Sequence, residues 1–215
     1  MTAIIFPGQG SQTVGMVRDF YDNFKISRQI FEEIEDYVQI DLKKIIFDNE
    51  ENKLNLTQFT QICIFTASFV IYKTLDFEGN LKSENIHIML GHSLGEYTAL
   101  ACSGKINLKD CSLILKKRGE LMNLAVTPNE TGMAALIGLP ANRIQKIISN
   151  NNLKLEIAND NSEIQIVVSG KIEDLNNSRD LFLSNDVKKF ILLNVSAAFH
   201  SKYMLNAQKI LAEEI

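Results

Sequence analysis

The sequence predicts an α/β fold: a main domain built on a parallel sheet, with a smaller subdomain inserted into it. Short apolar runs alternate with stretches of helical periodicity through the first half of the chain. Glycine-containing turns follow the first two apolar runs, at 7–12 and 91–95. Beyond residue 127 the rhythm changes to a second set of strands and helices. We therefore expect residues 1–127 and 196–215 to form the main domain and residues 128–195 the subdomain.

In the main domain, residues 3–6 form a short β-type run that ends at the loop Pro-Gly-Gln-Gly-Ser-Gln, residues 7–12. Apolar residues at three- and four-residue spacing predict helices over 23–38 and 57–75, the second of them largely buried. A second apolar strand follows at 86–90. Alternating strands and helices predict a parallel sheet covered on both faces.

Ser93 lies in Gly-His-Ser-Leu-Gly, residues 91–95, directly after the second strand and before a predicted helix. This order of strand, tight turn and helix is that of a nucleophile elbow, which makes the main domain hydrolase-like. The flanking glycines avoid a collision between strand and helix, and the N–H of Leu94 at the helix start could stabilise an oxyanion. The alternative is an ordinary Gly/Ser turn with no chemistry.

Arg118 falls in the middle of the apolar face of a helix predicted over 108–124, with Asn107 as its N-cap. A guanidinium on an apolar stripe is costly to bury without an anionic partner, which could be a protein carboxylate or a ligand. The pattern equally allows a structural ion pair or an arginine whose stem alone is buried.

The subdomain shows strands at 132–139, 154–158, 164–169 and 188–195, with helices at 141–150 and 173–184. This βαββαβ order is typical of the ferredoxin-like arrangement. We expect it to form a small unit inserted after the arginine helix.

His200 follows the last predicted strand, in Ser-Ala-Ala-Phe-His-Ser at 196–201, and helical patterning continues from residue 202. Open α/β sheets assemble their sites at such strand-to-helix junctions, so His200 could face Ser93 as its general base. His87 lies within an apolar strand. The side chain of His92 should point away from the neighbouring serine hydroxyl.

The charge composition favours no class of macromolecular partner. The 22 basic and 26 acidic residues are interspersed and give a net charge of −4, with no basic stripe for nucleic acid. No signal-like leader or membrane-length apolar run occurs, so we expect a cytoplasmic protein. The three cysteines lack the spacing of a disulfide framework or a metal site.

Four motifs together resemble the malonyl-CoA:acyl carrier protein transacylases of fatty acid synthesis. They are residues 7–12, Gly-His-Ser-Leu-Gly-Glu at 91–96, Lys-Arg-Gly at 117–119 and Phe-His-Ser at 199–201, in the order and spacing of that family. The resemblance runs from residue 1 to about residue 205 and includes the ferredoxin-like insertion.

The resemblance implies roles for five residues. Ser93 would attack the thioester of malonyl-CoA, His200 would take its proton, and the backbone N–H groups of Gln9 and Leu94 would form the oxyanion hole. Arg118 would bind the malonyl carboxylate, which supplies the missing anion. The malonyl group would then pass to the phosphopantetheine thiol of acyl carrier protein, with no metal or redox cofactor.

Two departures leave that chemistry untouched: Ala198 and Ile62 stand where many members carry proline. A larger departure is that members usually continue well past the position of the last residue, so we expect that the C-terminal portion is lacking. Two alternatives therefore stay open. One is an inactive fragment of the transacylase; the other is a serine esterase of the α/β-hydrolase type, which could recruit Asp160, Asp174 or Asp186 as the third member of a triad.

Overall fold

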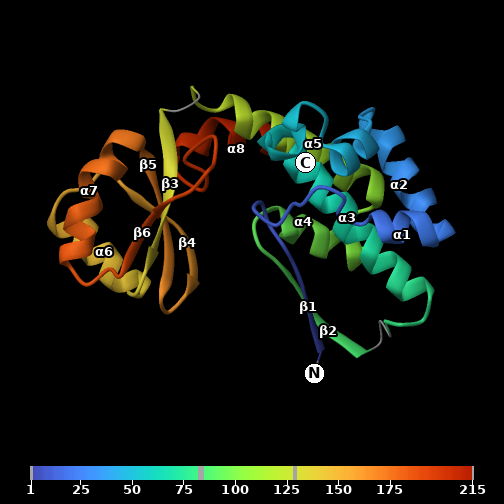
Figure 1. The fold of residues 1–215 in the computed structure, drawn as a ribbon, viewed down its shortest axis with the longest axis horizontal. Coiled ribbons are helices and arrows are strands. Elements are labelled where there is room, and N and C mark those ends of the chain that lie inside the picture. The colour runs from blue at the N-terminus through green and yellow to red at the C-terminus, as the bar shows by residue number, and fades with distance from the viewer. Residues whose placement is uncertain (1, 82–84, 128–129, 215) are drawn as a thin grey trace. The chain divides into compact units, whose positions relative to one another are not determined.

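The computed structural model describes residues 2–81, 85–127 and 130–214 and divides the chain into two compact units (Figure 1). The first unit comprises residues 1–121 with 214–215, and the second comprises residues 122–213. Each unit has a hydrophobic core of its own.

The sheet of the first unit consists of β1 (Thr2–Phe6) and β2 (Ile86–Gly91). The strands pair in parallel, from Ala3 opposite Ile88 to Phe6 opposite Gly91, which confirms the predicted parallel pairing. Within the described residues only one face is covered, whereas the prediction had cover on both faces. Successive side chains alternate between faces, and Phe6 is buried whereas Ile5 is 72% exposed on the other side.

The helices of this unit share one hydrophobic core with the sheet, and α4 (Leu94–Cys102) packs directly against both strands. The helices are α1 (Arg18–Asn23), α2 (Lys25–Val38), α3 (Thr57–Phe77), α4 and α5 (Leu108–Leu124), with a π-helical turn η1 (Lys44–Asp48) and a 3-10 segment η2 (Glu50–Asn55). As predicted, α3 is largely buried. The helix predicted over 23–38 is interrupted at Phe24, whose extended backbone separates α1 from α2.

The second unit contains β3 (Thr131–Ile137), α6 (Ala141–Asn150), β4 (Glu156–Ser162), β5 (Gln165–Lys171), α7 (Ile172–Ser184) and β6 (Lys189–Leu192). The strands form one antiparallel sheet in the order β4-β5-β3-β6. A short 3-10 turn, η4 (Lys202–Met204), and α8 (Leu205–Glu214) follow.

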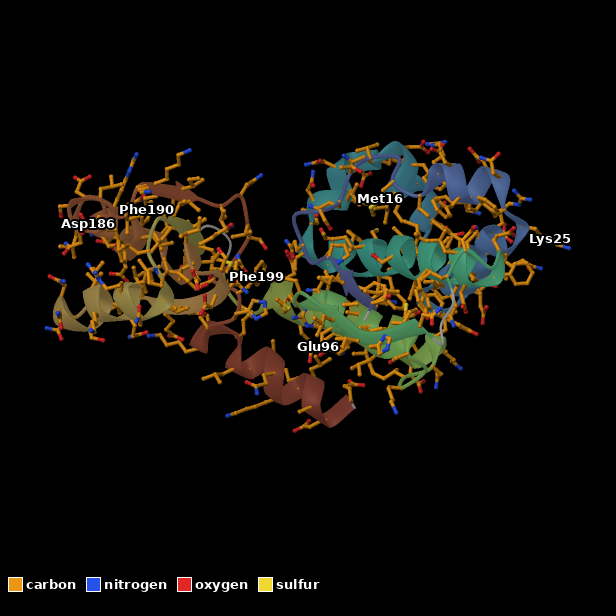
Figure 2. The ribbon with its side chains drawn as sticks, turned by 90° about the horizontal axis from the view of Figure 1, so that it is seen from below. Met16, Lys25, Glu96, Asp186, Phe190 and Phe199 are labelled. Carbon is orange, nitrogen blue, oxygen red and sulfur yellow. The ribbon has the colours of Figure 1, made fainter. Side chains whose placement is uncertain are left out.

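The two faces of this second sheet have different cover. On one face, Ala134 and Leu136 of β3 pack with side chains from α6 and α7, including Phe182, whose ring lies 6.1 Å from that of Phe190 (labelled in Figure 2). On the other face, Met133 and its neighbours pack with residues that come from the ends of the unit.

That second face is covered by residues from both sides of the predicted subdomain at 128–195. Residues 196–213, which the sequence assigns to the main domain, lie in the second compact unit, where Ala197 and Phe199 pack against Met133 and Val167. Met122 joins the same cluster, so the boundary falls within α5. The expected boundary at 127/128 adjoins residues 128–129, which lie outside the described residues.

Candidate active site

Ser93 occupies a strained turn between β2 and α4. Its backbone has φ 54° and ψ −110°, a conformation that a residue with a Cβ rarely adopts. The turn is closed by the N–H of Gly95, which donates to the His92 carbonyl at 3.0 Å. Local strain held by surrounding structure is typical of a functional position.

The two glycines of the turn are needed because strand, turn and helix meet at close range. A Cβ at Gly91 would lie 1.9 Å from the carbonyl carbon of Gly95, and a Cβ at Gly95 would lie 2.4 Å from the Phe6 carbonyl oxygen. No side chain fits at either distance. The predicted collision between strand and helix is therefore confirmed.

The start of α4 supplies a backbone donor beside the serine. Gly95 and Glu96 (labelled in Figure 2) donate their N–H groups to the carbonyls of His92 and Ser93, at 3.0 and 3.1 Å. Leu94 precedes both, and its N–H is the first of the helix. An N–H at this position points away from the helix body, and the helix dipole favours negative charge there.

The loop after β1 lies against the same turn. A Cβ at Gly8 would come within 2.6 Å of the His92 carbonyl oxygen, and the N–H of His92 donates to the Phe6 carbonyl at 3.1 Å. The side chain of Gln9 donates from Nε2 to Thr57 Oγ1 at 3.2 Å. These contacts place Gly8 beside the serine turn and the Gln9 side chain at the start of α3.

Arg118 reaches the serine from α5. Its Nη2 donates to Ser93 Oγ at 3.1 Å, its Nη1 donates to Gln61 Oε1, and its guanidinium carbon lies 5.6 Å from the centre of the Tyr97 ring. Both hydrogen-bond partners are neutral. Within the described part of the chain, no ion pair includes Arg118.

Burial lowers the pKa of the Arg118 guanidinium from its ordinary value, and Tyr97 and Glu96 oppose that shift. Arginine nevertheless stays protonated near neutral pH. The result is a partly buried cation beside a serine hydroxyl. The sequence left a structural ion pair open for this arginine; in the described residues its contacts are an amide, a hydroxyl and an aromatic ring.

Gly119 explains how α5 comes close enough for this contact. A Cβ at Gly119 would lie 3.0 Å from the carbonyl oxygens of Thr57 and Gln58, at the first turn of α3. The absence of a side chain lets the two helices approach, and Arg118 then lies opposite Gln61, one turn further along α3.

His200 lies in the second unit, between β6 and η4. Its backbone is also left-handed, with φ 54°, and the three residues before it are buried. The predicted junction between a strand and a helical segment is present. Gln9, Ser93, Leu94 and Arg118 belong to the first unit and lie together there.

Sequence reasoning missed Gln61 and Tyr97 as site residues. Gln61 is 1% exposed in α3, and a buried amide of this kind needs a polar partner. Tyr97 follows Ser93 by four residues, one helical turn, so that spacing could have indicated it. The aspartates weighed for an esterase triad lie in or beside β4 and α7, and Asp186 pairs with Arg143 at 3.8 Å.

The cysteines are free and buried, at positions 63, 102 and 111. Burial raises the pKa of the Cys102 and Cys111 thiols to about 12 and raises that of Cys63 as well. Among the described residues, no cluster of histidine, cysteine and acidic side chains could hold a metal ion. Nor does any helix in those ranges have the length and apolarity to cross a membrane.

Comparison with known proteins shows the family of the chain. The acyl transferase domain family matches residues 3–215, nearly the whole chain. The chain is 34% identical to the malonyl CoA-acyl carrier protein transacylase of Bacillus subtilis (strain 168), over 98% of this chain and 66% of that protein. The chain therefore belongs to the acyl transferase domain family, and it spans just under two thirds of that relative's length.

Solved structures give the same result. The malonyl CoA-acyl carrier protein transacylase of Clostridium perfringens superimposes with a TM-score of 0.92 at 37% identity, covering 99% of this chain and 66% of that one. A malonyl-transacylase solved in complex with a type II polyketide acyl-carrier protein superimposes at 0.91 and 33% identity, covering 98% and 68%.

Proposed function

We propose that this protein transfers a malonyl group from malonyl-CoA to the phosphopantetheine thiol of acyl carrier protein, in fatty acid biosynthesis, through a malonyl ester on Ser93. The observation that carries the proposal is the 3.1 Å contact between Arg118 Nη2 and Ser93 Oγ. It places a cation with neutral partners next to a hydroxyl at a helix start. A site of this kind suits an acyl group that ends in a carboxylate.

In the first half-reaction, Ser93 Oγ attacks the thioester carbonyl of malonyl-CoA while His200 accepts the hydroxyl proton. The backbone N–H groups of Gln9 and Leu94 stabilise the negative oxygen of the tetrahedral intermediate. The C–S bond then breaks, and coenzyme A leaves as a thiol with the proton that His200 returns. This order follows general acid and base catalysis by one imidazole.

In the second half-reaction, the thiol of phosphopantetheine gives its proton to His200 and attacks the malonyl ester. The ester C–O bond breaks, Ser93 recovers its proton, and the malonyl group leaves on the carrier protein. An acyl exchange between a thioester, an ester and a second thioester transfers no electrons, so the chemistry itself asks for neither a metal nor a redox cofactor. The relatives named above support the carrier as partner, since their names include it.

Arg118 gives this scheme its selectivity. A malonyl carboxylate can accept two parallel N–H bonds from the guanidinium, whereas an acetyl group leaves the partly buried cation without an anion. Before the substrate binds, the Gln61 amide and the Tyr97 ring hold the guanidinium in place.

We also infer the finer fold class. The order β3-α6-β4-β5-α7-β6 and the strand order β4-β5-β3-β6 support a ferredoxin-like subdomain at 128–195, inserted into a hydrolase-like main domain. The turn at Ser93, between a parallel strand and a helix, supports the second part.

The test is acid-quenched labelling with radioactive malonyl-CoA. The chain should retain one malonyl group, and Ser93→Ala should lower labelling by roughly a thousandfold. Ser103→Ala is the matched control, because that exposed hydroxyl lies just beyond the end of α4 and donates to the Leu100 carbonyl of its own helix. No label on the unaltered chain would refute the proposal.

Assays of the same chain and of Arg118→Ala distinguish the esterase alternative from the transferase. Rapid turnover of a neutral p-nitrophenyl ester that is unaffected by Arg118→Ala would favour a serine esterase. A malonyl label that depends on Arg118 would favour the transferase.

A further inference from the structure

The backbone at His200 needs support from outside its own turn. Its φ of 54° is left-handed, a conformation that glycine adopts more easily than histidine does. Left alone, such a residue would populate other conformations, each of which would send the imidazole in a different direction. Whatever holds the preceding peptides therefore determines where the imidazole lies.

Thr131 holds the first of these peptides. It is the first residue of β3, it is 4% exposed, and its Oγ1 accepts the N–H of Ala198 at 3.1 Å. Ala198 is itself completely buried, so its N–H has no access to water. A buried amide without a partner is strongly unfavourable, and the threonine hydroxyl removes that penalty.

Ser169 holds the second peptide. It lies in β5, it is 1% exposed, and its Oγ donates to the Phe199 carbonyl at 2.7 Å. That carbonyl belongs to the peptide that joins Phe199 to His200. Fixing its oxygen fixes the plane from which the His200 side chain leaves the backbone.

The two hydroxyls belong to one face of one sheet. In the antiparallel ladder, Thr131 lies opposite Lys171 and Met133 lies opposite Ser169, so the side chains of Thr131 and Ser169 point to the same side. Their neighbours on that face are apolar: Met133, Ala135 and Val167, which pack with Ala197 and Phe199 (labelled in Figure 2).

Two hydroxyls on an otherwise apolar face call for an explanation. Apolar side chains would pack as well against Ala197 and Phe199, but they would leave one N–H and one carbonyl of the turn buried and unpaired. Each hydroxyl satisfies one of those groups. This face of the sheet is therefore complementary to the backbone at 198–199, in its hydrogen bonds as well as in its apolar packing.

We propose that Thr131 and Ser169 are positioning residues for His200. They act through the peptides at 198 and 199 and set the direction of the imidazole. The inference rests on the proposed function, in which that imidazole exchanges a proton with Ser93. Neither hydroxyl takes part in the chemistry.

Three variants and one control test the role. Ser169→Ala and Thr131→Val each remove one hydroxyl at nearly constant size. Thr131→Ser keeps the hydroxyl and removes only the methyl group. Ser178→Ala is the matched control, because Ser178 is also 1% exposed in the same unit, but its Oγ donates to the Leu175 carbonyl within α7.

Two readouts distinguish positioning from simple support of the fold. The first is the rate of malonyl loading on Ser93, measured at saturating malonyl-CoA and as a function of its concentration. We expect Ser169→Ala and Thr131→Val to lower the saturated rate by about tenfold to a hundredfold, with the half-saturating concentration nearly unchanged. Thr131→Ser should recover most of the rate, and Ser178→Ala should load like the unaltered chain.

The second readout is the imidazole resonance of His200 in the NMR spectrum, assigned with His200→Gln. It should be single and sharp in the unaltered chain and in Ser178→Ala. In Ser169→Ala and Thr131→Val it should broaden or split, because several turn conformations exchange. If Thr131→Val does not fold, Ser169→Ala alone decides.

The proposal is overturned if Ser169→Ala and Thr131→Val match Ser178→Ala in both readouts. A failure of the proposed function would look different. In that case His200→Gln would load Ser93 as fast as the unaltered chain, while the resonance would still report whether the two hydroxyls hold the turn.

Discussion

At the scale of single residues, the contacts of Arg118 say most about the acyl group. A structural arginine in a partly buried position is expected to pair with a carboxylate. Here the guanidinium contacts the Gln61 amide, the Ser93 hydroxyl and the Tyr97 ring, all of them neutral. These partners hold the group in place, and the acid that acts on its charge is Glu96. Under the proposed function, the malonyl carboxylate would be the anion that binds it.

Replacing Arg118 should therefore change selectivity. Arg118→Ala should lower malonyl loading by roughly a hundredfold, the equivalent of about 2.7 kcal/mol at 1.36 kcal/mol per factor of ten. Acetyl loading should stay similar or rise, because the acetyl group never had the ion pair. Loading rates with radioactive malonyl-CoA and acetyl-CoA measure both.

Arg118→Lys is the informative companion variant. It keeps the charge and loses the two parallel N–H donors, so its malonyl loading should fall between those of the unaltered chain and Arg118→Ala. Acetyl loading also corrects for the lost hydrogen bond to Ser93, since both acyl groups need the same serine. Equal losses for both acyl groups would show that Arg118 only holds the serine.

At the scale of elements, the close meeting of β1, β2 and α4 determines the geometry of the site. Gly95→Ala would put a Cβ 2.4 Å from the Phe6 carbonyl oxygen, which is backbone and cannot move aside cheaply. We expect the free energy of unfolding to fall by about 1–3 kcal/mol in urea denaturation, together with a loss of malonyl loading.

Gly132→Ala provides the comparison. The nearest atom to its added Cβ would be Ile172 Cγ1 at 3.3 Å, on a side chain that can adjust. Its effect on stability should be clearly smaller, and loading on Ser93 should persist. Equal destabilisation by both variants would mean that the approach of α4 to β1 is not the constraint that we infer.

Elements with a local sequence signal were predictable. The helix at α5 was predicted with its observed bounds, and the strand, turn and helix around Ser93 were placed correctly, because periodicity and glycine spacing depend on neighbours along the chain. The strand predicted at 154–158 is instead β4, Glu156–Ser162. Pairing with β5 through two irregular steps extends it over polar residues that composition alone assigns to a turn.

Contacts between residues that are far apart in the sequence could not be predicted. The pairing of Gln61 with Arg118 joins α3 to α5 across 57 positions, and no local pattern indicates it. The same holds for Thr131 and Ser169, which look like ordinary strand residues until Ala198 and Phe199 are placed against them. Packing of this kind also assigns residues 196–213 to the second unit.

At the scale of the whole molecule, the two units carry separate cores and only the first contains cysteines. Burial raises the pKa of Cys102 and Cys111 from 9.0 to about 12, so their thiolate fraction at pH 8 is very small. Because the thiolate is the nucleophile, iodoacetamide should alkylate the folded chain far more slowly than the urea-unfolded chain, in which all three thiols should react.

The same pKa shifts predict how stability depends on pH. A thiol whose pKa is raised in the folded state keeps its proton there while the unfolded chain loses it, so the stabilisation is complete below pH 9 and is lost as pH rises toward about 12. Urea denaturation between pH 8 and pH 11 should show a falling free energy of unfolding, with a shallower fall in Cys102→Ala and Cys111→Ala. Rapid alkylation of the folded chain at pH 8, or a slope unchanged in both variants, would contradict the buried state of these thiols. It would also mean that the core of the first unit opens more readily than its packing indicates.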